Sequence, residues 1–101
     1  MGTLTVNNGT YYTSDTNEAV FNWYGAQTCV INGGTFIGSL YGLQTSLGTT
    51  YINAGSFSGA QWGIMNSGGM TYYKNNGAYS FSGSNLNMFG VSADLNNAGF
   101  Y

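Results

Sequence analysis

Ile31-Asn32-Gly33-Gly34-Thr35-Phe36 holds the pattern that decides the fold of this chain: Asn, a small residue, Gly, any residue and an aromatic residue. The same pattern occurs five times, at residues 7–11, 32–36, 53–57, 75–79 and 97–101. Counted from Asn to Asn, the spacings are 25, 21, 22 and 22 residues. A repeat of about 20 to 50 residues is typical of chains in which one structural unit stacks on the next. The pattern therefore predicts a stack of similar coils.

Each repeat begins with a short segment that reads as a β-strand. The four segments are Thr3–Val6, Thr28–Ile31, Thr49–Ile52 and Thr71–Lys74. Because successive side chains of a strand point to opposite faces, the small apolar residues should face inward and the threonines outward. Burial is expected at Val6, Ile31, Leu43, Ile52 and Ile64. An outward column is expected at Thr3, Thr28, Thr49 and Thr71, with Ala93 in the fifth coil.

The corner after each of these strands is marked by the Asn and the Gly of the pattern. Gly supplies the backbone conformation that a sharp corner needs. An Asn at a corner can bond to its equivalent one coil away. We therefore expect a structural ladder of Asn and Gly residues along the stack. Its members are Asn7, Asn32, Asn53, Asn75, Asn97, Gly9, Gly34, Gly55, Gly77 and Gly99.

Two further strands complete each repeat. The aromatic residue after the corner begins the second strand, and a third is indicated at 19–21, 42–44, 63–65 and 85–87. Three short strands and three corners in about 22 residues make one coil of a parallel β-helix, also called a β-solenoid. The sequence thus predicts an all-β fold of about 4–5 coils in a single domain over residues 1–101. Dense Gly, Asn, Ser and Thr give helix little support.

The register of the last two coils is left open by the sequence. Ser80-Phe81-Ser82-Gly83 copies Ser56-Phe57-Ser58-Gly59 at a spacing of 24 residues instead of 22. Either a two-residue β-bulge shifts the fourth coil, or the last coils do not follow the pattern. We favour the bulge. In the unshifted register, Tyr72 and Lys74 would point inward.

Two of the coils resemble a known family. Ile31-Asn32-Gly33-Gly34-Thr35-Phe36-Ile37-Gly38 and Ile52-Asn53-Ala54-Gly55-Ser56-Phe57-Ser58-Gly59 are similar to the Ile-Asn-Gly-Gly-Thr-Phe-x-Gly coils of right-handed parallel β-helix proteins. Such coils occur in phage tail spikes and fibres and in bacterial surface adhesins. The resemblance implies a right-handed β-helix with a structural or adhesive role. It says little about a ligand.

Composition excludes some classes of function. Only Asp15, Glu18, Lys74 and Asp94 are charged, against a typical content of roughly 25%. One Lys and no Arg remove the electrostatic attraction on which binding to nucleic acids and anionic membranes depends. No apolar stretch approaches the ~18 residues of a membrane span. Low charge also removes the repulsion that keeps molecules apart, so the expected partner is a second copy, in a homo-oligomer or filament.

The sequence offers little for catalysis or for a cofactor. Asp15 and Glu18 are the one possible carboxylate pair, because Asp94 should lie some 15 Å away at about 4.8 Å per coil. Without His, a Ser-His-Asp triad cannot be built. The single cysteine, Cys29, can form neither an internal disulfide nor a cysteine metal cluster. We expect no enzyme, no cofactor and no metal site, and a buried Cys29 thiol, with a reactive or intermolecular thiol as the alternative.

Two sets of outward side chains are candidates for binding. The threonine column resembles the surface of ice-binding β-solenoids, although Thr is also an ordinary strand residue. Phe36 and Phe57 should stack in the core, but the tyrosines are too many for so thin a core. Candidate surface contacts are Tyr12, Tyr41, Tyr51, Trp62 and Tyr73. Exposed Tyr and Trp suit a protein interface first and a glycan second.

The expected function is that of a structural or adhesive β-solenoid module, which self-assembles or forms part of an extracellular or virion fibre. The chain as given carries no signal peptide. A carbohydrate-binding surface is the first alternative, an ice-binding surface is less favoured, and a polysaccharide-degrading enzyme on the same fold is the least favoured. An exposed aromatic row beside amides would favour the glycan, whereas exposed strand edges would favour assembly.

Overall fold

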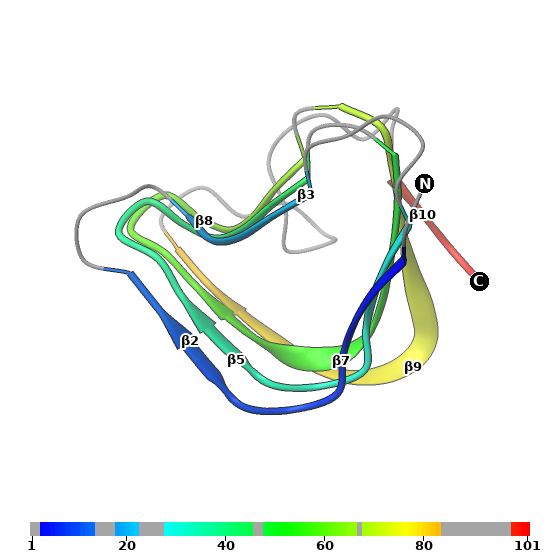
Figure 1. The fold of residues 1–101 in the computed structure, drawn as a ribbon, viewed down its shortest axis with the longest axis horizontal. Helices are drawn as coiled ribbons and strands as arrows, with labels where there is room; N and C mark the ends of the chain where they lie inside the picture. The colour runs from blue at the N-terminus through cyan, green and yellow to red at the C-terminus, as the bar shows by residue number, and fades with distance from the viewer. Residues whose placement is uncertain (1–2, 14–17, 23–27, 46–47, 67, 84–97) are drawn as a thin grey trace.

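The chain is built from β-strands in the computed structural model, which describes residues 3–13, 18–22, 28–45, 48–66, 68–83 and 98–101 (Figure 1). The strands are β1 (Thr3–Val6), β2 (Thr10–Tyr12), β3 (Glu18–Asn22), β4 (Thr28–Ile31), β5 (Thr35–Ile37), β6 (Tyr41–Thr45), β7 (Thr49–Ser58), β8 (Trp62–Asn66), β9 (Met70–Ser82) and β10 (Ala98–Phe100). These ranges contain no helix, and so none that could cross a membrane. The prediction of an all-β fold is confirmed.

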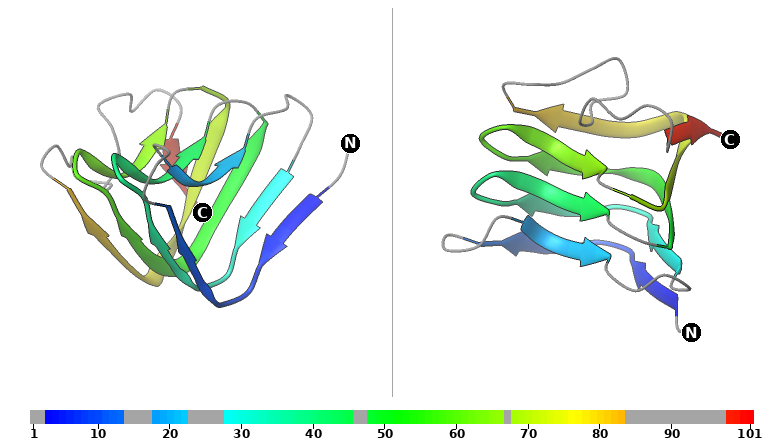
Figure 2. Two further views of the ribbon diagram at one scale, coloured as in Figure 1. Left: turned by 60° about the vertical axis from the view of Figure 1, so that its left-hand side comes forward. Right: turned by 90° about the horizontal axis from the view of Figure 1, so that it is seen from above.

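Every strand pair in the described ranges is parallel, and through the first three repeats each strand lies beside its counterpart from the next repeat. Strands β1, β4 and β7 pair so that Thr3 lies beside Thr28 and Thr28 beside Thr49. Strands β2, β5 and β7 pair in the same way, and so do β3, β6 and β8. Figure 2 shows the resulting levels, from blue near the N-terminus to yellow. In the large sheet, the Asn-to-Asn spacings of 25 and 21 residues in the first three repeats are thus the spacings between paired strands.

The strands form two sheets around one core. Strands β7 and β9 are long and bend at a corner, so β7 pairs with β4 through its first half and with β5 through its second half. This continuity joins seven strands into one sheet that covers two sides of the core. Strands β3, β6 and β8 form a separate sheet of three, which closes the third side (Figure 1).

The core lies where the period-two pattern predicted it. Val6, Ile31, Ile52, Leu43 and Ile64 are all buried, as expected. Thr3 is exposed, and Thr28 and Thr49 are half-buried on the outer face. Cys29, Thr50 and Thr71 occupy another inward column, in which the Thr71 hydroxyl donates to Thr45 Oγ1 at 3.0 Å.

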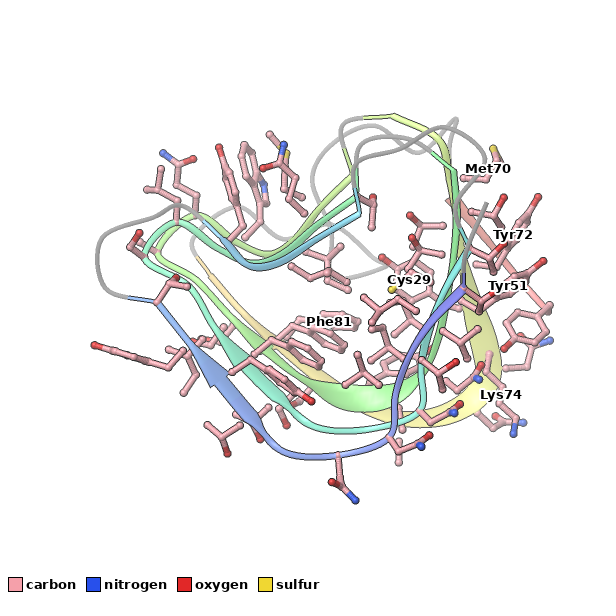
Figure 3. The ribbon with its side chains drawn as sticks, viewed as in Figure 1. Cys29, Tyr51, Met70, Tyr72, Lys74 and Phe81 are labelled. Carbon is pink, nitrogen blue, oxygen red and sulfur yellow. The ribbon has the colours of Figure 1, made fainter. Side chains whose placement is uncertain are left out.

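An aromatic stack fills the other side of the core. Tyr11, Phe36, Phe57 and Phe81 follow one another from level to level, with ring centroids 5.0, 5.0 and 5.6 Å apart. The planes of Phe36 and Phe57 differ by 4°, which confirms the predicted pairing of these rings. Figure 3 shows Phe81 and Cys29 pointing inward from the large sheet.

The fourth repeat departs from the expected register. Ile52 pairs with Tyr73, but Ala54 pairs with Ala78, so Asn53 on β7 stands opposite residues 74–77 on β9. A bulge was favoured from the sequence, and a register shift is found on β9, but the two-residue size was wrong, because four residues of β9 stand opposite one of β7, which makes three extra residues. Met70 to Tyr73 come before the shift and keep the 21-residue spacing.

This shift corrects the expectations that depended on the fourth and fifth repeats. Thr71 is buried, and the outward column continues from Thr49 to Met70. Tyr73 is buried instead of exposed, whereas Tyr72 is half-exposed and Lys74 exposed, so neither points inward as the unshifted register required. Gly99 pairs with Tyr72 inside a strand, so it is not a corner residue. Asn97, Ala93 and the expected strand at 85–87 lie outside the described residues.

Candidate functional site

The Asn ladder exists in the first three repeats and has a direction. Asn32 Nδ2 donates to Asn7 Oδ1 at 3.0 Å, and Asn53 Nδ2 donates to Asn32 Oδ1 at 2.8 Å. Asn53 Oδ1 in turn accepts a hydrogen bond from the hydroxyl of Tyr101. Asn75 does not extend the ladder through Asn53, because the bulge places it elsewhere and its backbone N–H donates to the carbonyl of Tyr101.

The glycine ladder, like the Asn ladder, is present in the first three repeats and not in the fourth. Gly9, Gly34 and Gly55 have φ values of 108°, 110° and 135°, a region that L side chains rarely adopt. After the second and third corners, the next N–H donates to the glycine carbonyl one level away, from Thr35 to Gly9 at 2.8 Å and from Ser56 to Gly34 at 2.9 Å. In the fourth repeat Asn76, with φ 60°, adopts the left-handed conformation instead, and Tyr79 pairs with Gly55 where Gly77 was expected.

The face formed by β1, β2 and β3 is one open edge of both sheets within the residues that the structure describes. Each of these strands pairs on one side within the described ranges, with β4, β5 and β6 respectively. Leu4 is 41% exposed, although its partner Cys29 is 1% exposed and Thr50, the next member of the column, is fully buried. Tyr11 stacks on Phe36 and is half-buried. We call Leu4, Val6, Asn7 and Tyr11 with the edges of β1, β2 and β3 the N-terminal edge.

Outward aromatic residues form two groups, one on each sheet. Tyr41 and Trp62 stack on the small sheet, with ring centroids 5.4 Å apart and planes differing by 26°. Tyr51 and Tyr72 stack on the large sheet at 5.5 Å, and Tyr101 meets Tyr51 edge-on at 5.3 Å. Tyr12, which is 67% exposed, is a third outward aromatic residue.

The predicted surface residues are thus only partly brought together. Tyr41 and Trp62 form one pair, while Tyr12 and Tyr51 lie on other strands. Tyr73 belongs to the core, where burial and then the charge of Tyr79 raise the pKa of its phenol. Sequence reasoning missed Tyr72, and the signal that could have found it is the 21-residue spacing from Tyr51, shared with Asn32 and Asn53.

The residues considered for chemistry give no described site. Asp15 and Asp94 lie outside the described residues, and Glu18 is described through the backbone of β3. Among the described residues, no group of three or more His, Cys, Asp and Glu side chains could hold a metal ion. Cys29 is buried, as predicted, and burial raises the pKa of its thiol to about 11. A thiol of that kind is a poor nucleophile at neutral pH because little of it is thiolate.

Comparisons were made with protein-family models, with curated proteins and with solved structures. Nothing in the three comparisons matches this chain. The proposals below therefore rest on the N-terminal edge and on the outward aromatic groups.

Proposed function

We propose that the chain is a right-handed parallel β-helix of about 4–5 coils of roughly 22 residues. Three columns of parallel strands support this proposal, because each passes through consecutive repeats with matching residues side by side. The resemblance of residues 31–38 and 52–59 to right-handed β-helix coils supports the handedness.

The module serves as a structural or adhesive element that assembles through the N-terminal edge with a second copy of the chain. The observation that carries this proposal is the exposure of Leu4. Leu4 belongs to an inward column, and it is 41% exposed because no further strand covers it among the described residues. A covering strand would bury Leu4 and would pair the open backbone groups of β1, β2 and β3.

Charge and the side-chain ladders favour a second copy as the covering partner. The chain has a formal net charge of −2 at pH 7 and only four charged residues, so little repulsion opposes its approach to itself. The edge also carries the outermost members of the Asn ladder and the aromatic stack, Asn7 and Tyr11. Repeated columns of this kind are satisfied by another level of the same sequence pattern.

We propose that the protein acts in a fibre or on a surface, outside the cell or on a virion, with no catalytic role and no cofactor. A filament follows if unlike ends meet and the repeat continues across the junction. A dimer follows if two N-terminal edges meet about a two-fold axis. Both arrangements bury Leu4.

Leu4→Lys tests the assembly, because it places a charge in the N-terminal edge at an exposed inward position of β1. The matched control is Ser56→Lys, which adds the same charge at an exposed outer position of β7, between β5 and β9. Sedimentation velocity over a series of concentrations, with electron microscopy, should show assemblies for the unmodified chain and Ser56→Lys. Leu4→Lys should shift the chain to monomers. A monomeric unmodified chain at high micromolar concentration would overturn the proposal and favour a neighbouring segment of a longer polypeptide as the cover.

A carbohydrate-binding surface is the second candidate, and the Tyr41–Trp62 pair on the small sheet favours it. Both rings are half-exposed, and the amide of Gln44 lies on the same strand as Tyr41. The pair ranks second because stacked rings give one face each to the other, which leaves less face for a sugar ring. Titration with soluble oligosaccharides should quench Trp fluorescence in the unmodified chain and in Trp23→Phe, but not in Trp62→Phe, if this surface binds glycans.

A further inference from the structure

Tyr51, Tyr72 and Tyr101 form a cluster of phenols on the outer face of the large sheet. Tyr51 contacts both of the others, with ring centroids 5.5 Å from Tyr72 and 5.3 Å from Tyr101. The planes of Tyr51 and Tyr72 differ by 23°, whereas those of Tyr51 and Tyr101 differ by 81°. Figure 3 shows Tyr51 and Tyr72 side by side on the outside, opposite to the direction in which Cys29 points. Tyr51 and Tyr72 are thus the near-parallel pair of the cluster.

Strand register holds these two rings together. Tyr51 and Tyr72 are direct partners across β7 and β9, and their chain neighbours Ile52 and Tyr73 are fully buried. Because side chains alternate along a strand, burial of Ile52 and Tyr73 in the core keeps the phenols of Tyr51 and Tyr72 on the outer face. Both phenols are half-exposed, so a reagent in solvent can reach them, whereas the phenol of Tyr73 is enclosed.

We propose that Tyr51 and Tyr72 form a site of oxidative crosslinking, where a one-electron oxidant such as a peroxidase with hydrogen peroxide joins them as dityrosine. Each phenol gives up one electron and one proton and becomes a phenoxyl radical. The two radicals couple through a new C–C bond between ring carbons ortho to the oxygens. The proton on each of those carbons then moves to the oxygen and restores the aromatic ring. Hydrogen peroxide takes up the two electrons and two protons and is reduced to two molecules of water.

The near-parallel geometry favours this pair over the edge-on pair. Stacked rings of direct strand partners bring corresponding ring edges next to each other, so rotation about the side-chain bonds can bring the ortho carbons together. In the edge-on pair, the edge of one ring faces the plane of the other. The product joins β7 to β9 just before the register shift between Ile52 and Ala54. A crosslink there removes conformational freedom from the unfolded chain and raises the melting temperature, as a disulfide does. The proposal does not depend on self-assembly.

The single lysine allows the crosslink to be located. Dilute protein is treated with a haem peroxidase and hydrogen peroxide, and the product is recognised by dityrosine fluorescence and by the intact mass of the denatured chain. Cleavage after Lys74 gives fragments 1–74 and 75–101. A bond between Tyr51 and Tyr72 stays within the first fragment, which loses two hydrogens. A bond to Tyr101 joins the two fragments.

Phenylalanine variants decide the outcome, because they keep the ring and remove the phenol. Tyr51→Phe and Tyr72→Phe should each abolish most of the intrachain product and the accompanying rise in melting temperature. Tyr12→Phe is the matched control, since Tyr12 is 67% exposed and would react first if exposure alone decided. Its product should equal that of the unmodified chain. The proposal is overturned if the crosslink joins the two fragments, if only crosslinked dimers form, or if Tyr72→Phe leaves the product unchanged.

Discussion

Adjacent residues of the same type have opposite environments in this protein. Thr49 is half-buried on the outer face and Thr50 is fully buried, and the same contrast holds for Tyr72 and Tyr73. Residue type therefore does not decide burial. Position in a strand decides it, because side chains alternate between the two faces of a sheet.

A large difference in stability is expected between inward and outward positions of β4. Ile31→Ala should lower the free energy of unfolding by about 2 to 5 kcal/mol, because Ile31 is fully buried in the core. Thr28→Ala, at an outer position of the same strand, should cost well under about 1 kcal/mol. Denaturant melts of the two variants measure the difference. Equal losses would mean that the assignment of inner and outer faces is wrong.

The buried thiol predicts a loss of stability in alkali. Burial raises the pKa of Cys29 from 9.0 in the unfolded chain to about 11 in the fold. As the pH rises, the unfolded chain therefore releases the thiol proton before the folded chain does. The contribution of Cys29 to stability is complete below pH 9.0 and is lost as the pH rises to about 11. Chemical denaturation at several pH values should show a smaller decline in this window for Cys29→Ala. An unchanged decline would indicate that Cys29 is ionised to the same extent in both states.

Ionisation of Tyr73 should also lower the stability of the fold, at a higher pH than ionisation of Cys29. Burial, followed by the charge of Tyr79, raises the pKa of its phenol from 10.0, so its stabilising effect is complete below pH 10.0 and lost above it. Tyr73→Phe keeps the buried ring and removes the ionisation. Its stability should fall less steeply above pH 10.0 than that of the unmodified chain.

At the scale of the element, β9 is the strand that departs from the repeat. Its first part continues the column of β4 and β7, and its second part continues the column of β5. The four residues 74–77 between these parts leave both pairings intact. A β-bulge tolerates such extra residues because they loop out of the ladder while the strands on either side keep their partners.

Deleting residues 75–77 should therefore leave the fold in place. Lys74 would then stand opposite Asn53, and Ala78 would follow in register with Ala54, so Phe81 keeps its stack on Phe57. Deleting residues 79–81 removes the same number of residues but takes away Phe81 and, with it, the ring that stacks on Phe57. Thermal melts should show a much lower melting temperature for the second deletion than for the first. The reverse order would show that residues 75–77 are themselves needed for the pairing of β7 with β9.

At the scale of the whole molecule, sparse charge determines how the proposed assembly should respond to salt. Attraction at the N-terminal edge would come from backbone hydrogen bonds and from burial of Leu4, with four charged residues in the entire chain. Salt screens ion pairs but leaves these contributions largely unaffected. The assemblies should keep the same size from low to high salt in sedimentation velocity. Dissociation at high salt would show that ion pairs hold the copies together.

The sequence by itself determined that the fold is all-β, that equivalent strands of successive repeats pair, and how the first three repeats are arranged. The period of the Asn-Gly-aromatic pattern predicted the parallel pairing of equivalent strands, the Asn ladder from Asn7 to Asn53 and the stacking of Phe36 on Phe57. These features are local or recur wherever the motif recurs, so a pattern of residue types is enough to locate them.

Only the tertiary structure decided the register of β9 and, with it, which aromatic residues lie outside. The motif at residues 75–79 copies the earlier corners, yet burial of Tyr73 beside Ile52 and the stacking of Phe81 on Phe57 take precedence over that match. The physical reason is that filling the core and pairing the strands are properties of neighbouring levels together. A motif in one repeat specifies neither the filling of the core nor the pairing with the next repeat. Tyr72 was therefore missed as an outward residue, and Tyr73 was assigned to the wrong side.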